Sequence, residues 1–366
     1  MKILHCADLH LDSKMNSNLD RDKAKERRLE LLNTFKRMVD YASDCGIGVI
    51  LIAGDMFDTK NISATTRNEV LRIFENYKDI NFYYLKGNHD NDNFLAGIES
   101  LPENLYMFDE EWREYEELDG RVVISGIELS RENSSKIYNS LVLDASKFNI
   151  VMLHGQEAES DLGDKTEVIN LRELRNKGID YLALGHVHKP KIQELDPRAK
   201  YCYPGCLEGR GFDECGPHGF VVLDIDENTM QYSTEFADFA TRRLYEVGVD
   251  VTGCNNSWEM IERARSSVRH CECKASDLVK IVLEGAVDVE CEKNLDYIEK
   301  NFEDDFYYVK VKDETTISIS ADDYRFDESL KGEFVRSVLE DDNISEEDKR
   351  VVIRYGLQVL AGEEVM

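Results

Sequence analysis

The sequence lacks the features that mark several large classes of protein. Its 366 residues include only five prolines, and they contain neither a low-complexity tract nor an internal repeat, so extensive disorder is not expected. No apolar run is long enough to span a membrane. The N-terminal residues have neither the long apolar core nor the small-residue cleavage site of a signal peptide. We therefore expect a cytoplasmic globular protein that does not associate with a membrane.

Cysteine is present without a pattern that would hold structural zinc. The nine cysteines never occur as Cys-x-x-Cys, which argues against a zinc ribbon. Free thiols in a reducing cytoplasm are the expected state of these residues.

Positive charge is scarce. The chain has 45 lysines and arginines against 74 aspartates and glutamates, which gives a formal net charge of −29. A protein that grips nucleic acid by itself usually carries a basic face, because Lys and Arg contact the phosphates. Two interpretations stay open: the protein does not touch nucleic acid, or a partner supplies the basic surface while metal ions supply local positive charge.

Short apolar segments alternate with amphipathic helices in the first two-thirds of the chain. The patterns predict strands at Lys2–Ala7, Val49–Ala53 and Asn81–Leu85, separated by helices at Arg21–Cys45 and Ala64–Tyr77. Further strands are predicted at Leu105–Phe108, Arg121–Glu128, Phe148–Leu153, Tyr181–Leu184 and Gly219–Asp226. This order predicts an α/β fold in which a two-sheet β-sandwich is flanked by helices.

The sequence changes character near Thr241. Beyond this residue, the runs Arg243–Val249, Leu278–Leu283 and Phe306–Ile319, with helices at Ser257–Val268 and Lys293–Phe302, predict a small α+β unit. Two amphipathic helices are then predicted at Leu330–Leu339 and Ser345–Leu360. We therefore predict three domains, which cover residues 1–240, 241–325 and 326–366.

Polar residues of metal-binding types follow five of the predicted strands. They are Asp8 and His10; Asp55 and Asp58; Asn88, His89 and Asp90; His154; and His186 and His188. Ligands of α/β proteins bind at the C-terminal edge of the sheet, so these side chains are expected to meet there. Each motif alone is weak, because Asp favours turns. The complete set at successive strand ends is not explained by turns.

The residue types indicate the class of metal. Carboxylate, amide and imidazole groups without thiolate suit Mn²⁺, Fe or Zn²⁺. Seven ligands are too many for one open catalytic ion, and they suit two ions about 3.5–4 Å apart that share a carboxylate. Such a pair activates a water and polarises a phosphoryl group, while a histidine backed by a carboxylate can protonate the leaving oxygen.

Residues 1–190 resemble the calcineurin-like metallophosphoesterase superfamily in the motifs Asp-x-His, Gly-Asp-x-x-Asp, Gly-Asn-His-Asp, His-Gly and Gly-His-x-His. The resemblance implies two divalent ions, with Mn²⁺ favoured over Fe or Zn²⁺. It implies that Asp8, His10 and His188 hold the first ion, that Asn88, His154 and His186 hold the second, and that Asp55 bridges them. His89 then faces the scissile phosphate. Asp58 occupies the position that orients this histidine, with Asp90 as a second candidate for that role.

A narrower resemblance is to the nuclease subunit of SbcCD-type DNA-repair exonucleases, in particular their YhaO-like branch. It rests on the segments Ala7–Ser13, Tyr203–Glu214 and Leu330–Arg336. It implies a metal-dependent phosphodiesterase that cleaves DNA as an exonuclease, with endonuclease activity as a further option. It also implies a small capping domain, a homodimer, and a coiled-coil ATPase partner of the structural-maintenance type that docks on the C-terminal helices.

Two alternative functions and one ambiguous residue remain at this point. The same fold could serve a small-molecule phosphodiesterase or phosphatase, or a scaffold that no longer cuts. Arg210, in the glycine-rich segment Tyr203–Glu214, could contact a phosphate with both guanidinium nitrogens. Alternatively, it pairs with Asp213 or Glu214 and holds a tight connection between strands.

Overall fold

The computed structural model describes residues 1–15, 19–58, 62–90, 94, 100–159, 167–288, 291–318, 324 and 326–360. The chain divides into two compact units, Met1–Arg243 and Leu244–Met366. The predicted division of the chain into three domains stays a prediction. None of the nine cysteines, all of which are described, forms a disulfide.

The first unit contains two six-stranded sheets. The first sheet has the order β14-β13-β1-β2-β3-β4, in which β1 to β4 run parallel and β13 and β14 are antiparallel to their neighbours. Its strands are β1 (Lys2–Cys6), β2 (Val49–Ala53), β3 (Asn81–Leu85), β4 (Leu105–Met107), β13 (Gly219–Ile225) and β14 (Tyr232–Asp238). All five residues of β2 are buried, as expected for a central strand covered on both faces.

The second sheet has the order β11-β12-β10-β7-β6-β5. Its four inner strands are parallel, and the two edge strands are antiparallel. The strands are β5 (Arg113–Glu117), β6 (Val122–Gly126), β7 (Phe148–His154), β10 (Tyr181–Gly185), β11 (Lys191–Glu194) and β12 (Lys200–Tyr203). A short parallel pair, β8 (Gln156–Ala158) and β9 (Val168–Asn170), follows β7.

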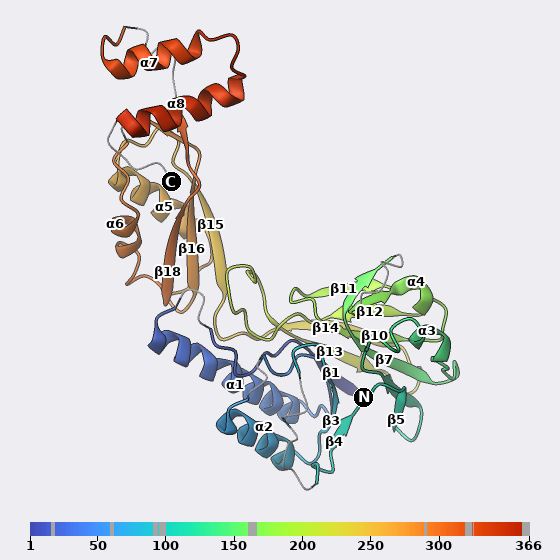
Figure 1. Ribbon diagram of the computed structural model, residues 1–366. Helices are drawn as coiled ribbons and strands as arrows, with labels where there is room; N and C mark the ends of the chain where they lie inside the picture. Colours follow the sequence, from blue (N-terminus) through green and yellow to red (C-terminus); the bar gives the residue numbers. More distant parts are fainter. Residues whose placement is uncertain are drawn as a thin grey trace. The chain divides into compact units, whose positions relative to one another are not determined.

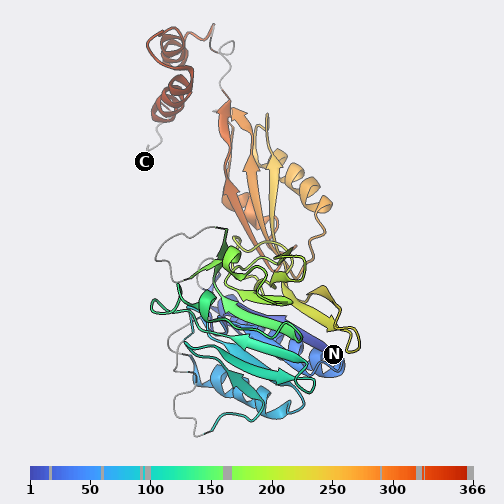
Figure 2. The ribbon, with the colours of Figure 1, turned by 90° about the vertical axis from the view of Figure 1, so that its right-hand side faces the viewer.

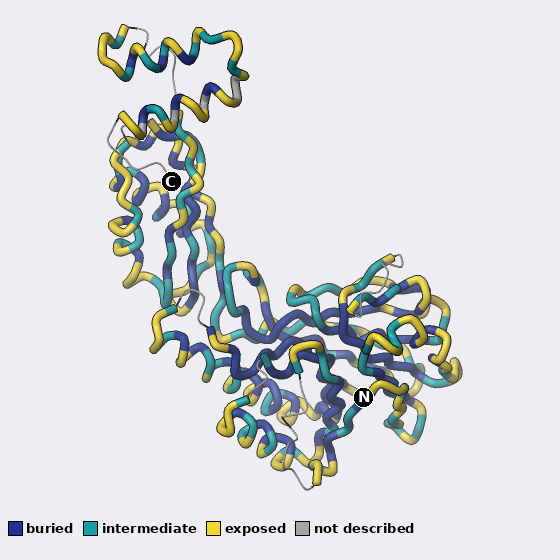
Figure 3. Tube along the Cα trace, viewed as in Figure 1, coloured by how far each residue is buried: buried dark blue, intermediate teal, exposed yellow. Residues whose placement is uncertain are grey.

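Three layers of apolar side chains hold the two sheets and the helices together. The middle layer joins residues such as Val49 of the first sheet to Ile150 of the second. The first sheet packs its other face on the helices α1 (Arg21–Asp44) and α2 (Ala64–Asn76), and the second packs on α3 (Ile137–Ser140) and α4 (Leu171–Leu174). The predicted two-sheet sandwich flanked by helices is therefore confirmed (Figures 1 and 3).

The helix ends follow from local sequence. Ser63 accepts a hydrogen bond from the backbone N–H of Thr66 and thus caps α2, as the sequence indicates. Asp20 caps α1 in the same way and accepts from the backbone N–H groups of Asp22 and Lys23. These caps fix where each helix starts after the loop that follows β1 or β2.

The second unit is built on a parallel sheet of three strands in the order β15-β16-β18. These are β15 (Leu244–Asp250), β16 (Leu278–Glu284) and β18 (Tyr308–Asp313), which lie side by side in Figure 2. The helices α5 (Ser257–His270) and α6 (Leu295–Lys300) pack on the sheet around a shared apolar core. Two short strands, β17 (Ala286–Asp288) and β19 (Thr316–Ser318), pair separately.

Within the run Phe306–Ile319, the structure has two strands, β18 and β19. Glu314 and Thr315 lie between them, and the N–H of Glu314 still bonds to the carbonyl oxygen of Leu283. Ile319 itself lies outside the described residues. The predicted C-terminal helices are present as α7 (Leu330–Leu339) and α8 (Glu346–Leu360), which enclose a small core of their own. Among the described helices, none combines the length and the apolar character that crossing a membrane requires.

Candidate metal centre

The C-terminal ends of β1, β2, β3, β7 and β10 meet at one edge of the sandwich. The loops after β1 and β2 run side by side, with hydrogen bonds from the N–H of Asp8 to Gly54 O and from the N–H of His10 to Asp55 O, both of 3.0 Å. Across the two sheets, the carboxylate of Asp8 accepts from the N–H of His186 at 3.0 Å. Hydrogen bonds within the protein therefore hold these loops against one another.

Four of the candidate ligands have an unusual backbone conformation. The φ angles of Asp8, His10, Asp55 and His186 are 51°, 44°, 51° and 102°. Positive φ costs free energy for residues other than glycine, and such residues cluster at functional sites. Side-chain type alone could not have predicted this strain.

Glycines let the chains approach closely around these ligands. A Cβ on Gly54 would lie 2.1 Å from Nδ1 of His154, and one on Gly185 would lie 1.9 Å from the carbonyl oxygen of Ala53. A Cβ on Gly87 would lie 2.2 Å from Oδ1 of Asp55. Because the φ of Gly87 is outside the left-handed region, this glycine is needed for the room that it leaves to the carboxylate of Asp55.

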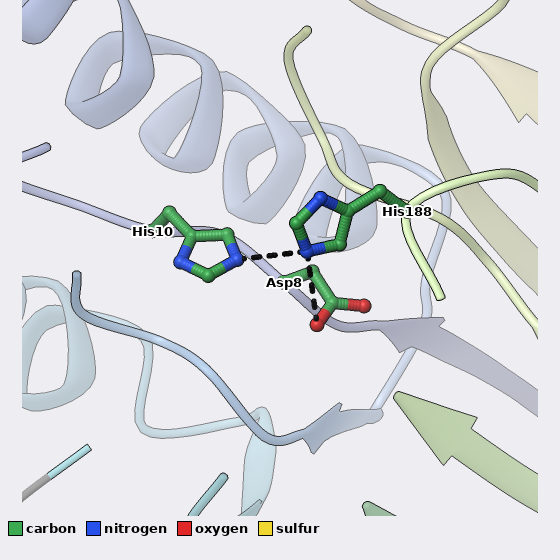
Figure 4. A group of neighbouring side chains, drawn as sticks. All are labelled: Asp8, His10 and His188. Atoms are coloured by element: carbon green, nitrogen blue, oxygen red, sulfur yellow. Dashed lines mark hydrogen bonds and ion pairs between the residues drawn. The ribbon is translucent and has the colours of Figure 1, made fainter. Parts of the chain in front are cut away.

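The first group of candidate ligands is formed by Asp8, His10 and His188, which point toward one another in Figure 4. The Nε2 atoms of His10 and His188 are 3.1 Å apart, and Nε2 of His188 is 3.9 Å from Oδ1 of Asp8. Asp8 and His10 are almost completely buried. Three donor atoms of the kinds that transition metals prefer therefore converge on one point.

The second group is formed by Asn88, His154 and His186. Oδ1 of Asn88 lies 3.0 Å from Nε2 of His154 and 3.3 Å from Nδ1 of His186. Asp55 stands between this group and the first. Its Oδ2 is 3.3 Å from Nε2 of His154 and 3.9 Å from Nε2 of His10. All seven predicted ligands are thus brought together, with Asp55 between the two groups.

The far nitrogens of two imidazoles face a hydrogen-bond acceptor, and that of a third lies near a carboxylate without a hydrogen bond. Nδ1 of His154 lies 2.9 Å from the carbonyl oxygen of Ala53, and Nδ1 of His188 lies 2.7 Å from Glu214. Nδ1 of His10 is 3.2 Å from Oδ1 of Asp58. A histidine that donates through one nitrogen presents the lone pair of the other, which is the usual arrangement behind metal ligands. The role of Glu214 behind His188 was missed, because no motif links residues 26 positions apart.

His89 stands beside the first group and is 47% exposed. Its ring lies edge to face with that of His10, at 5.2 Å between centroids. Nδ1 of His89 is 3.6 Å from Oδ1 of Asp58. Asp90, the second candidate partner, instead accepts from the backbone N–H groups of Met56, Phe57 and Gly87 at 2.9–3.2 Å. It braces the loop that carries Asp55, and the carboxylate next to the ring of His89 is that of Asp58.

Arg210 lies behind the first ligand group. Its guanidinium contacts Glu214 at 2.9 Å and Asp58 at 3.2 Å. Of the two carboxylates that the sequence offered as its partners, Glu214 is thus the one engaged. Substrate contact by Arg210 stays a prediction, and it would have to coexist with these two ion pairs.

The electrostatics of the site fit bound cations. In the described part of the chain, no lysine or arginine lies within ion-pair distance of Asp8 or Asp55, although both are buried. Burial raises the pKa of Asp8 to about 6, and the charge of Asp55 adds to this effect. Such buried and unneutralised carboxylates are stable only when they are paired or bound to a metal.

The pKa values of His154 and Asp55 are also shifted at this site. Burial opposes the charged form of both, but their mutual hydrogen bond raises the pKa of His154 to about 9 and holds that of Asp55 well below its usual range. Without a metal, the two side chains thus retain a proton between them. A cation held by the same atoms takes over the role of that proton.

The chain was compared with known proteins. The model of the calcineurin-like phosphoesterase family matches residues 1–190. The uncharacterized metallophosphoesterase YhaO of Bacillus subtilis is 29% identical over 302 residues, which cover 78% of this chain and 72% of that protein. The DNA double-strand break repair protein Mre11 of Methanopyrus kandleri is 27% identical over 327 residues, which cover 80% of this chain and 67% of that protein.

Among solved structures, TT1561 of Thermus thermophilus is 12% identical with a TM-score of 0.41, and the match covers 64% of this chain and 98% of that one. The family match spans 190 of the 366 residues and contains every candidate metal ligand. The chain therefore belongs to the calcineurin-like phosphoesterases, a family of metallophosphoesterases that use a dinuclear metal centre.

Proposed function

We propose that this protein is a two-metal phosphodiesterase that cleaves DNA. The observation that carries the proposal is the convergence of seven oxygen and nitrogen donors from five strand ends, with the half-exposed His89 beside them. Asp8, His10 and His188 hold one ion, Asn88, His154 and His186 hold the other, and Asp55 is shared. Bound ions supply an activated water and neutralise charge on the phosphate. The choice of Mn²⁺ over Fe or Zn²⁺ belongs to the same proposal.

His89 is the residue that meets the substrate. It lies outside the two ligand groups, and its ring is accessible to a molecule above the centre. Asp58 sits next to its Nδ1 and orients the ring so that Nε2 can donate a proton to the leaving oxygen. Because Ser13 donates to the other oxygen of Asp58 at 2.9 Å, this carboxylate has little freedom to move.

DNA is the proposed substrate class because relatives with this sequence pattern include proteins named for double-strand break repair. The net charge of −29 means that the chain alone repels DNA. A partner that holds the duplex, the coiled-coil ATPase implied by the sequence resemblance, removes this difficulty. A homodimer remains part of the proposal.

A metal-retention test separates catalysis from metal binding. His89→Ala should retain both ions by elemental analysis and lose cleavage of end-labelled single-stranded and duplex DNA in Mn²⁺, by about 10²–10⁴-fold for a lost proton donor. His270→Ala is the matched control, because His270 is exposed on α5 and bonds only to its own helix in the described residues. Cleavage by His89→Ala at the wild-type rate would show that the assigned role is wrong.

The same assays address the two alternatives. A small-molecule phosphodiesterase would hydrolyse bis(4-nitrophenyl) phosphate and would leave DNA intact even with the ATPase present. A scaffold would cleave neither substrate, although it would still associate with the ATPase. The complete set of ligands favours catalysis over a scaffold.

Docking of the ATPase is assigned to the C-terminal helices. Val352 and Val359 of α8 are 38% and 60% exposed, and their seven-residue spacing places them on one side of the helix. An apolar helix face of this kind suits a helical partner such as a coiled coil. Removing residues 328–366 should abolish co-purification with the ATPase and leave hydrolysis of bis(4-nitrophenyl) phosphate unchanged.

Point variants test the same surface without removing the helices. Val352→Asp with Val359→Asp should weaken the complex, whereas Ser337→Asp on the exposed side of α7 should not. Undiminished co-purification of the truncated chain would place the docking surface elsewhere.

A further inference from the structure

Two carboxylates stand behind the histidines of the first ligand group. Glu214 accepts from Nδ1 of His188 at 2.7 Å, and Asp58 lies 3.2 Å from Nδ1 of His10. The two imidazoles face each other through their Nε2 atoms at 3.1 Å. Each ring is therefore held between a carboxylate at its back and the other ring at its front.

Arg210 connects these two carboxylates. Nη1 donates to Oδ1 of Asp58 at 3.2 Å, and Nη2 donates to Oε1 of Glu214 at 2.9 Å. The contacts close a ring that runs from His10 through Asp58, Arg210 and Glu214 to His188 and back. A planar guanidinium has two nitrogens at the spacing that such a bridge needs, which an ammonium group lacks.

Glu214 is itself held firmly in place. It accepts from the backbone N–H of Arg210 at 2.7 Å, and its own carbonyl oxygen lies 2.6 Å from Nε2 of His218. Glu214 is almost fully buried, and the side chain of Arg210 is 20% exposed. Because neither side chain can swing into solvent, a salt bridge that is shielded and anchored in this way holds the side chains that contact it in fixed positions.

The charge of Arg210 has a second effect. Asp58 and Glu214 contact the same two histidines, His10 and His188, as Asp55 and Asp8 do. Without Arg210, these four carboxylates would have no fixed positive charge among them. The single charge of the guanidinium offsets part of the negative charge of Asp58 and Glu214 and leaves Asp8 and Asp55 to bind metal.

We propose that Arg210, Asp58 and Glu214 form an arginine clamp that aims His10 and His188 at the first metal and thereby sets the affinity for that ion. This inference rests on the proposed metal centre. In it, Arg210 is a positioning residue whose Nη1 and Nη2 atoms are used by the clamp, which assigns it a role different from contact with the substrate phosphate.

The test is calorimetric titration of the metal-stripped full-length chain with Mn²⁺ alone. Glu214→Gln and Arg210→Met should weaken one of the two binding events by about 10–100-fold, the usual effect of losing a partner behind a metal ligand, and leave the other unchanged. Arg210→Lys should lose affinity to an intermediate degree, because one ammonium cannot bridge both carboxylates. This variant keeps the charge and so guards against a failure to fold.

Arg198→Met is the matched control. Arg198 donates two hydrogen bonds to Asp180, of 2.8 and 2.7 Å, at the other end of β10 from His186. The change removes a comparable Arg–carboxylate pair from the same unit, so it should lower the melting temperature and leave the affinity for both ions unchanged.

The outcomes are distinguishable. Unchanged affinity for both ions in the clamp variants, with a raised KM for bis(4-nitrophenyl) phosphate, would make Arg210 a substrate contact and overturn the clamp. Equal weakening of both ions in the clamp variants and in Arg198→Met would also overturn it, since the effect would then be general. If Asp55→Asn retains both ions as well, it is the proposed metal centre that fails.

Discussion

Replacing Gly87 by alanine tests how the backbone positions the carboxylate shared by the two ligand groups. The added Cβ would lie 2.2 Å from Oδ1 of Asp55 and 2.6 Å from its backbone nitrogen. Since the φ of Gly87 is compatible with alanine, the effect is steric. Oδ1 of Asp55 also accepts the backbone N–H of His89 at 2.9 Å, and the clash would break this hydrogen bond.

The expected magnitude follows from these contacts. Oδ1 of Asp55 must retreat by more than about 1 Å to reach ordinary van der Waals contact with the new methyl group. Overpacking of this kind costs about 1–3 kcal/mol, and a lost hydrogen bond to a charged acceptor costs a similar amount. Because the two effects overlap, we expect the free energy of unfolding to fall by about 2–4 kcal/mol. The distance between a metal ion and a ligand atom varies by only about 0.2 Å in a working site, so both ions should be bound far more weakly.

The assay is elemental analysis after dialysis against a fixed Mn²⁺ concentration, together with urea denaturation of the metal-free chain. Gly48→Ala is the control, because the nearest heavy atom to its added Cβ, the carbonyl oxygen of Asp79, is 3.8 Å away. It should change stability by less than about 1 kcal/mol and retain the metal. Wild-type metal content in Gly87→Ala would refute the reasoning that this backbone contact places Asp55.

Two further predictions concern charge. Asp55→Asn should lose metal while keeping wild-type circular dichroism, because it removes the negative charge that both ligand groups share; unchanged metal content would exclude Asp55 as the bridge. Arg27→Met should lower the free energy of unfolding by about 3–5 kcal/mol, since Arg27 is buried 3.5 Å from the buried Glu208 and donates to Gly209 O at 2.7 Å. The exposed pair of Arg72 with Glu69 provides the comparison, and Arg72→Met should cost less than about 1 kcal/mol in the same urea titration.

The parts of the fold that sequence reasoning predicted are those in which pattern and burial coincide. Val49–Ala53 is apolar throughout and is buried throughout, so its place at the centre of a sheet followed directly. The edge strands β5 and β14 were missed, because their side chains are mostly polar and half-exposed, and their pairing depends on the neighbouring strand. The short pair β8 and β9 was missed for the same reason.

For the candidate site, too, some features could be predicted from the sequence and others could not. The seven candidate ligands could be named from the sequence because each follows an apolar run and all carry metal-binding groups. Glu214 and the backing of His154 by Ala53 O were not, because both depend on contacts between residues that are distant in sequence. Spacing favoured Asp58 as the carboxylate beside His89, and sequence proximity favoured Asp90. Which of them lies next to the ring depends on which way each carboxylate turns in three dimensions.

Backbone geometry, more than side-chain freedom, determines where the donors lie. Asp8 and Asp55 adopt left-handed φ angles, and glycines at 54, 87 and 185 allow approaches that any Cβ would block. The free energy that this strain costs must come from packing, and Leu11 and Phe57 of the loops after β1 and β2 are themselves buried in the core of the sandwich. It follows that substitutions in the glycines should impair metal binding as much as substitutions in the ligands. It also follows that loosening the core under β1 and β2 should weaken metal affinity before it unfolds the chain.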